Sequence, residues 1–192
     1  METNIKKYIW LGVAVAIAAI IIYFAAFGGD SLQSLSGKPK IIGEKTAQGI
    51  VAVPSTSPIN EETEQVLTKE GAPVKQNVEP GAPEAPQQSN PITPESLPET
   101  AIKLEATSFQ FTPSSFDVKK NAPVTLSVTG MDSRTHIFKF DDASLSAVAI
   151  GIGPGETRAI TFNAPATAGE YKFHCDVPGH ASQGMTGSMI VK

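Results

Sequence analysis

The sequence has only one cysteine, which excludes a disulfide within the chain. Any chemistry of Cys175 must therefore come from its thiol, from a metal ion or from pairing with another chain. Basic residues are also few, because 15 Lys and Arg stand against 19 Asp and Glu for a formal net charge of −4. The sequence has no basic stripe of the kind that nucleic acid requires. We therefore expect no nucleic-acid partner.

The middle of the chain, residues 28–100, has few aromatic residues and holds ten of the fifteen prolines. It carries ten acidic and five basic residues, so its charge is negative. Such a composition buries too little apolar surface to offset the entropy cost of ordering the chain. We predict a disordered Pro- and Glu-rich linker, which would span roughly 45–50 Å as a flexible coil.

The N-terminal segment, residues 1–27, contains one long uncharged run from Tyr8 to Phe27. About 20 apolar residues suffice to cross a bilayer as a helix, so we predict a single-pass membrane anchor. Lys6 and Lys7 favour a cytoplasmic N-terminus, which would place everything after residue 28 in the periplasm or outside the cell. A cleaved signal peptide and a buried soluble helix are the alternatives. The length of the run and its terminal aromatic residues favour the anchor.

The last segment, residues 101–192, alternates apolar and polar residues in short runs separated by turn signals. In "SSFDVKK", Phe116 and Val118 share one side, and "VTLSV", "HIFKF" and "AITF" continue the period of two. Several short strands at this spacing predict an all-β domain, either an antiparallel sandwich or a Greek-key barrel.

The cysteine lies where one of these strands ends. Alternation in "YKFHC" places Cys175 on the same inner face as Phe173, and His174 on the outer face. The loop that follows brings back His180 after five residues and Met185 after five more. A strand end and a loop can thus bring a thiolate, an imidazole and a thioether together.

A second histidine can join them from a distant strand. In "THIFKF", His136 shares the inward face of Phe138 and Phe140, so both strand ends can meet at one pole of a sandwich. Two histidines, a cysteine and a more distant methionine are the ligand set of a blue-copper electron-transfer site. Taken alone, each of these residues is more often a packing residue than a metal ligand. Zinc is the weaker metal alternative, because zinc sites rarely recruit methionine.

The stretch "FHCDVPGHASQGMTGSMIV", preceded by "FTPSSFDVKKNAPVTLSV" and "SRTHIF", resembles the cupredoxin family, in particular its azurin, auracyanin and rusticyanin type. The resemblance covers residues 101–192. It implies a cupredoxin-like Greek-key β-sandwich with one type 1 copper on His136, Cys175, His180 and Met185. Many members have Asn or Ser where Ile137 stands, which leaves the usual hydrogen bond to the cysteine sulfur open.

The resemblance implies an electron carrier rather than an enzyme, with redox proteins as partners, and we expect a monomer. Residues 177–187 carry no charge, so we predict an apolar docking patch at which an edge of His180 is exposed. We interpret His174 as an exposed strand residue. The alternative is that it relays electrons to the redox centre of a partner protein. Packing is the expected role of Met131 and Met189. Copper storage or delivery, and a non-redox interaction module, are the competing functions.

Overall fold

The computed structural model describes residues 41–42, 44–45, 50–51 and 56–192. All of these residues belong to one compact unit, Pro39–Lys192. Its strands are β1 (Ile41–Ile42), β2 (Glu44–Lys45), β3 (Ile50–Val51), β4 (Ile59–Asn60), β5 (Ile102–Thr107), β6 (Gln110–Thr112), β7 (Ser115–Val118), β8 (Pro123–Gly130), β9 (His136–Phe140), β10 (Ala149–Ile152), β11 (Thr157–Asn163), β12 (Gly169–Cys175) and β13 (Thr186–Val191). Three short 3-10 helices complete the described structure: η1 (Pro94–Ser96), η2 (Ala143–Leu145) and η3 (Ala181–Gln183).

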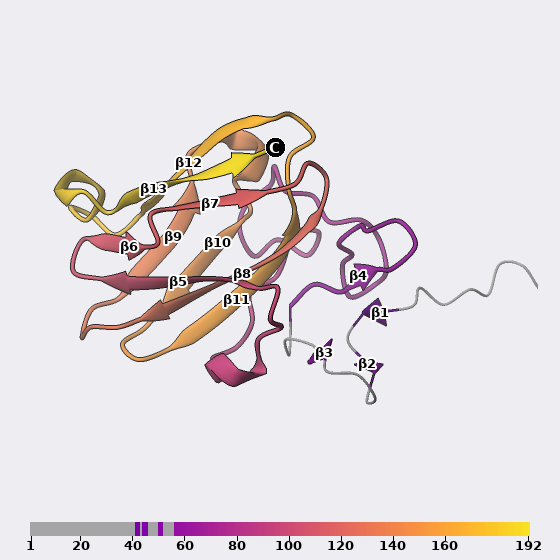
Figure 1. Ribbon diagram of the computed structural model, residues 1–192, viewed down its shortest axis with the longest axis horizontal. Helices are drawn as coiled ribbons and strands as arrows, with labels where there is room; N and C mark the ends of the chain where they lie inside the picture. Colours follow the sequence, from indigo (N-terminus) through magenta and orange to yellow (C-terminus); the bar gives the residue numbers. More distant parts are fainter. Residues whose placement is uncertain (1–40, 43, 46–49, 52–55) are drawn as a thin grey trace, which may run out of the picture. The chain divides into compact units, whose positions relative to one another are not determined.

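Strands β5 to β13 form two sheets that face each other, as Figure 1 shows. One sheet has the order β10-β9-β12-β13-β7 and the other the order β11-β8-β5-β6. Most neighbouring strands are antiparallel, while β13 with β7 and β5 with β8 are parallel. The predicted all-β sandwich is therefore confirmed. Two further pairs, β1 with β4 and β2 with β3, are only two residues long on each strand.

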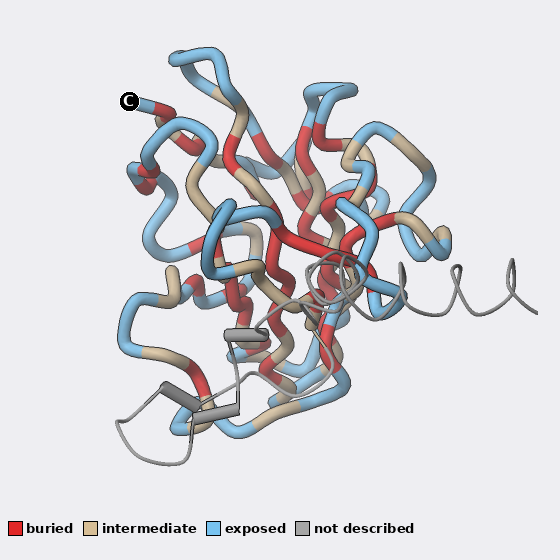
Figure 2. The backbone as a smooth tube through the Cα atoms, turned by 90° about the vertical axis from the view of Figure 1, so that its right-hand side faces the viewer, coloured by how far each residue is buried: buried red, intermediate tan, exposed pale blue. Residues whose placement is uncertain are grey.

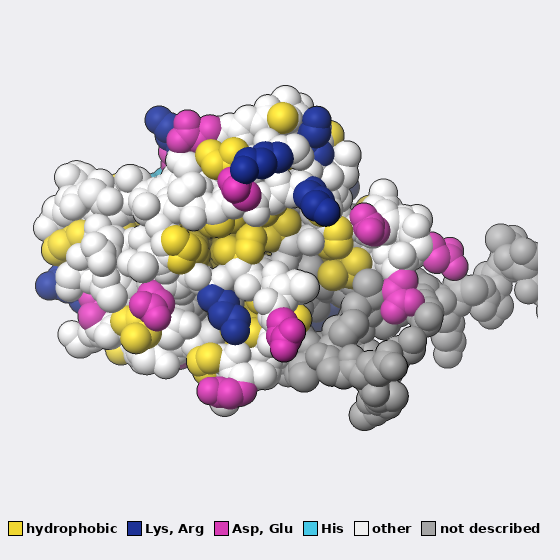
Figure 3. Space-filling view, viewed as in Figure 1, with side chains coloured by type: hydrophobic (Ala, Val, Ile, Leu, Met, Phe, Trp, Pro, Cys, Tyr) yellow, Lys and Arg dark blue, Asp and Glu magenta, His cyan; other side chains and the backbone are white. Residues whose placement is uncertain are grey.

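Apolar side chains of both sheets fill the space between them, and the buried residues accordingly run through the centre of the domain (Figure 2). Six phenylalanines form a continuous aromatic cluster, with ring centroids 4.8 to 6.1 Å apart around Phe173 and its neighbours: Phe111, Phe116, Phe138, Phe140, Phe162 and Phe173. A band of apolar side chains remains visible at the surface between β7 and β5 (Figure 3).

The period of two predicts the buried face of most strands correctly. Strand β9 alternates buried and half-buried residues along its length, and β7 buries Phe116 and Val118 while exposing Asp117. Strand β11 departs from the pattern, because Ala159 and Thr161 are buried together with Ile160 and Phe162. A strand that is buried on both faces must be covered by further chain on its second face or along its edge. Here the residues before β5 supply that cover.

Residues 56–100, the larger part of the predicted linker, are folded onto the sandwich. The residues that retain at most 7% of their accessible surface include Ser57, Val66, Leu67, Thr68, Ala85, Ser89 and Leu97. The amide of Ser89 donates to the carbonyl of Ala159 at 2.7 Å, and the amide of Ala159 donates to the Ser89 hydroxyl at 3.0 Å. The prediction of a disordered linker is therefore wrong for these residues.

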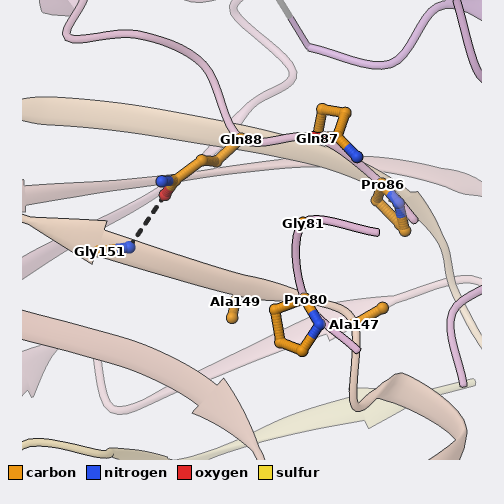
Figure 4. A pocket seen from close by; sticks show the side chains of 8 residues that line it. All are labelled: Pro80, Gly81, Pro86, Gln87, Gln88, Ala147, Ala149 and Gly151. Carbon is orange, nitrogen blue, oxygen red and sulfur yellow. Dashed lines mark hydrogen bonds between the residues drawn. The ribbon is translucent and has the colours of Figure 1, made fainter. Parts of the chain in front are cut away.

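Glutamine side chains extend this cover to the neighbouring sheet. The amide of Gly151 on β10 donates to Oε1 of Gln88 at 2.9 Å, as the dashed line in Figure 4 marks. Gln76 accepts two hydrogen bonds. Its Oε1 atom accepts one from the amide of Asn163, and its backbone carbonyl accepts one from the amide of Ala147. The segment thus satisfies backbone groups at the outer edges of both β10 and β11.

Backbone pairing, and not apolar burial alone, orders residues 56–100. An edge strand presents unsatisfied N–H and C=O groups, and a chain that pairs with them is held without a hydrophobic period of its own. Proline fits such a position, because it lacks a donor and can face away from the sheet. A low apolar content therefore did not mean disorder here.

The predicted membrane anchor, residues 8–27, lies outside the described residues, as does most of 28–55. In the part of the chain that the structure describes, no helix combines the length and the apolar character that crossing a membrane requires. The domain boundaries predicted at residues 27 and 28 thus stay predictions.

We expect removal of residues 56–100 to destabilise the domain and to make it self-associate. A fragment of residues 101–192 loses several hydrogen bonds, each worth about 1 kcal/mol net, and exposes the edges of β10 and β11. Urea unfolding should show a loss on the order of 3 kcal/mol relative to a fragment of residues 56–192, and light scattering should show oligomers. Equal stability and a monomeric 101–192 fragment would show that the segment is only an appendage.

Candidate metal centre

Strand β12 positions the cysteine, because it lies between β9 on one side and β13 on the other. Cys175 is the last residue of β12, is paired with Phe138 and is 1% exposed. The pairing brings β9 alongside, so that its first residue, His136, lies at the same end of the sandwich with no exposed surface. The two strand ends predicted to meet at one pole do so.

Three of the four predicted ligand residues come together at this pole. One ligand atom each from His136, Cys175 and His180 lies within 4.8 Å of the others. The Sγ atom of Cys175 is 4.0 Å from Nδ1 of His136 and 3.4 Å from Nδ1 of His180. Both imidazoles thus turn Nδ1 toward the sulfur, so that one metal ion could contact all three ligand atoms.

Met185 closes the loop that follows Cys175. Its amide donates to the carbonyl of His180 at 3.1 Å, and its carbonyl accepts from the amide of Cys175 at 3.0 Å. The side chain of Met185 is fully buried within the core cluster. Backbone hydrogen bonds to Cys175 and His180 therefore hold Met185, the fourth predicted ligand, next to them.

The loop itself is ordered by short-range hydrogen bonds. Gln183 and Ser182 donate through their side chains to the carbonyl of Gly179, at 3.0 and 2.9 Å. Gly179 and Gly184 have φ angles of 88° and 102°, a left-handed conformation that glycine adopts without strain. The contacts that shape the loop thus come from its own residues.

The cysteine sulfur accepts a backbone hydrogen bond. The amide of Ile137 lies 3.4 Å from Sγ of Cys175, as β9 leaves His136. The side chain at position 137 therefore does not decide this contact, which the main chain supplies. A backbone donor aimed at the sulfur can also contact a metal-bound thiolate, the form in which cysteine binds metal.

Two groups that the sequence pattern does not reveal contact the histidines. The carboxylate of Asp132 lies 3.0 Å from Nε2 of His136, and the Phe109 ring packs edge-on against His180 at a centroid distance of 5.2 Å. Arg134 in turn stacks over Phe109, 5.1 Å from its centroid. For Asp132, its position four residues before His136 was the only signal in the sequence that it could contact this ligand. For Phe109 the sequence held no signal of a contact with His180.

The structure also places the other two methionines of the domain, His174 and the exposed edge of His180. Met189 is fully buried as predicted, but Met131 is 54% exposed, so packing is not its role. His174 is half-buried and its ring lies between the carboxylates of Asp141 and Asp176. His180 keeps 7% exposure, so the predicted exposed edge is small.

The sequence profile of the cupredoxin-like domain family matches residues 86–191, more than half of the chain. An all-β sandwich that gathers two histidines, a cysteine and a methionine at one pole defines a copper protein of the blue type. The chain belongs to the cupredoxin-like family. The match begins 15 residues before the predicted boundary at 101 and so includes part of the edge cover.

Several solved structures are similar, although no curated protein matches the sequence. Dithionite-reduced auracyanin from Roseiflexus castenholzii is 23% identical, covering 49% of this chain and 98% of its own, with a TM-score of 0.44. Auracyanin A from Chloroflexus aurantiacus is 22% identical over 48% and 98%, with a TM-score of 0.41. Amicyanin from Paracoccus versutus is 21% identical over 54% and 92%, also with a TM-score of 0.41.

The donor set fits one type 1 copper. Imidazole nitrogen suits both oxidation states of copper, and soft sulfur ligands suit Cu(I). The three ligand atoms converge in a buried site, and all four residues are at most 7% exposed. The expected cofactor is therefore consistent with the residues present.

We expect the metal-free protein to lose stability as the pH falls below about 6.5 because of His180. Burial lowers the pKa of this imidazole, and the neighbouring His136 and Arg134 act in the same direction, while Asp132 opposes them. The unfolded chain binds a proton at an ordinary pKa near 6.5 and the folded chain at a lower one, so acid favours unfolding. The stabilisation is complete above about 6.5 and is lost as the pH falls toward the folded pKa.

Urea unfolding of the metal-free protein between pH 7.5 and 5.5 measures this effect. Each unit by which the pKa is lowered corresponds to about 1.4 kcal/mol. The His180→Gln variant should show a smaller decrease over the same range. An identical pH dependence in the two proteins would assign the effect to other groups.

Proposed function

We propose that this protein is a membrane-tethered, mononuclear blue-copper electron carrier that passes electrons between extracytoplasmic redox partners. His136, Cys175, His180 and Met185 are the proposed ligands of one type 1 copper. The observation that carries the proposal is the convergence of three buried ligand atoms within 4.8 Å on strand ends and a hydrogen-bonded loop. Tethering through residues 8–27 remains part of the proposal.

The bound metal would supply one-electron chemistry by cycling between Cu(I) and Cu(II). The chain's own part is to keep its ligand atoms in place during that change. Cys175 ends a strand that pairs with β9 and β13, and the ligand loop is closed by hydrogen bonds between Cys175, His180 and Met185. A framework that does not need to rearrange keeps the cost of electron transfer low.

Burial of the site argues against a delivery function. A protein that hands copper on needs ligands that a recipient can reach, whereas Cys175 and His136 are at most 1% exposed. The same burial protects the thiol from oxidation. The electron-carrier function is therefore favoured over copper delivery.

The surface at this pole is suited to a redox partner. Met131 is the one large apolar side chain strongly exposed among residues 56–192, and it lies in the loop that leads to His136. Phe109 is half-buried beside His180, and the ligand loop carries no charge between Val177 and Gly187. We infer that these residues form the docking patch, through which electrons reach His180.

Copper loading tests the metal site directly. The full chain with one equivalent of Cu(II) should show a strong blue or green band from sulfur-to-copper charge transfer, which ascorbate bleaches reversibly. Cys175→Ser should abolish the band, because the serine oxygen cannot provide the same transition. A colourless protein with weakly held, exchangeable copper would contradict the electron-carrier function and would favour copper handling.

Electron self-exchange tests the docking patch without a known partner. Ala181→Glu places a charge on η3 within the patch, so two copies would repel each other as their copper ends meet. We expect the self-exchange rate, measured by NMR line broadening in mixed Cu(I) and Cu(II) protein, to fall about tenfold at low salt. Ala143→Glu, at the same position of η2, is the matched control. Equal rates in both variants would place the contact elsewhere.

A further inference from the structure

Asp132 holds the ring of His136 from the side opposite the sulfur. Its Oδ1 atom lies 3.0 Å from Nε2 of His136, while Nδ1 of the same ring faces Sγ of Cys175 at 4.0 Å. The ring is therefore fixed between an acceptor on one nitrogen and the metal-binding cluster on the other.

The carboxylate is itself anchored by two donors. The amide of Arg134 donates to Oδ1 at 2.9 Å, and the hydroxyl of Ser108 donates to Oδ2 at 3.2 Å. These contacts join the β5–β6 turn to the loop before β9. With 19% of its side chain exposed, Asp132 is a fixed part of the site's wall and not a mobile surface charge.

Asp132 offers the ring of His136 only acceptors, because an ionised carboxylate has no N–H or O–H to donate. A neutral imidazole has a single N–H, so a carboxylate at Nε2 places the proton there and leaves the lone pair on Nδ1.

The two histidines of the cluster differ in this respect. Both turn Nδ1 toward Cys175, but in the described part of the chain only His136 has a hydrogen-bond partner at Nε2. The contact of His180 on its outer side is the ring of Phe109. One imidazole is thus fixed by a charged acceptor and the other by packing.

We propose that Asp132 is a positioning residue of the metal centre: it selects the Nε2–H tautomer of His136, fixes the plane of the ring and adds a negative charge beside the site. Outer partners of this kind raise the basicity of a histidine ligand. A fixed negative charge also favours the more positive oxidation state of a metal. The charge effect rests on the proposed copper function, whereas tautomer selection concerns the metal-free chain as well.

Two substitutions separate geometry from charge. Asp132→Asn keeps an oxygen acceptor for Nε2–H but removes the charge, and Asp132→Ala removes both. Asp142→Asn is the matched control, because Asp142 also accepts hydrogen bonds from its own loop but caps η2 beyond the other end of β9. Circular dichroism and urea unfolding establish that each full-length variant is folded before it is compared.

The first measurement is the tautomer of His136, read from nitrogen-15 NMR of the metal-free full chain at neutral pH. The wild type, Asp132→Asn and the control should show the Nε2–H form, and Asp132→Ala should show a mixture. Cu(II) affinity should fall about 10- to 100-fold in Asp132→Ala. An unchanged tautomer together with unchanged affinity in Asp132→Ala overturns the positioning role.

The second measurement is the reduction potential of the copper-loaded chain. Asp132→Asn should weaken Cu(II) relative to Cu(I) by about tenfold, which raises the potential by about 59 mV for a one-electron couple. A potential equal to that of the wild type overturns the charge effect. A wild-type chain that forms no blue site contradicts the proposed function instead, and the tautomer measurement still decides the positioning role.

Discussion

The pairing of β12 with both of its neighbours is the constraint on which the rest of the metal centre depends. Cys175 ends β12, His136 begins β9, and the chain that leaves Cys175 must turn within ten residues to start β13 at Thr186. Two ladders therefore fix the sulfur, one histidine and both ends of the ligand loop. A register shift of one residue would turn Cys175 to the outer face and His174 inward.

The aromatic cluster makes that register costly to change. Phe173 lies two residues before Cys175 and contacts Phe111, Phe116, Phe138 and Phe140. Aromatic contacts of this kind contribute about 0.5–1.5 kcal/mol each beyond their buried area. Gly187, paired with Phe173 across the ladder, leaves room for the ring, because a Cβ atom there would come within 2.5 Å of it. Core packing and site geometry are thus set by the same residues.

Much of the sandwich and of the site could be predicted from the sequence, because both depend on local patterns. Alternation identified the inward faces of β7, β8 and β9, and the spacing of Cys175, His180 and Met185 required only one strand end and one loop. The family profile confirms the resemblance that these motifs suggested.

What could not be predicted depends on contacts between distant segments. Residues 56–100 have no apolar period, and their order comes from hydrogen bonds to edges that exist only once β10 and β11 have formed. Phe109 reaches His180 because the β5–β6 turn lies beside the ligand loop, a proximity that no local pattern encodes. Asp132 has the right spacing from His136, but spacing alone does not show which nitrogen it contacts.

Residues 56–100 also contact β11 at the end that lies far from the ligand residues. Val66 and Gln76 bond to Asn163, the last residue of β11, which pairs with Pro123 at the start of β8. His136 belongs to the opposite end, where β11 begins, and seven residues of strand span about 20 Å. The same segment also contacts β11 at its start, where the amide of Ile92 donates to the carbonyl of Thr157 at 2.9 Å. Residues 56–100 therefore follow the edge of β11 from the end far from the ligands to the end on the ligand side.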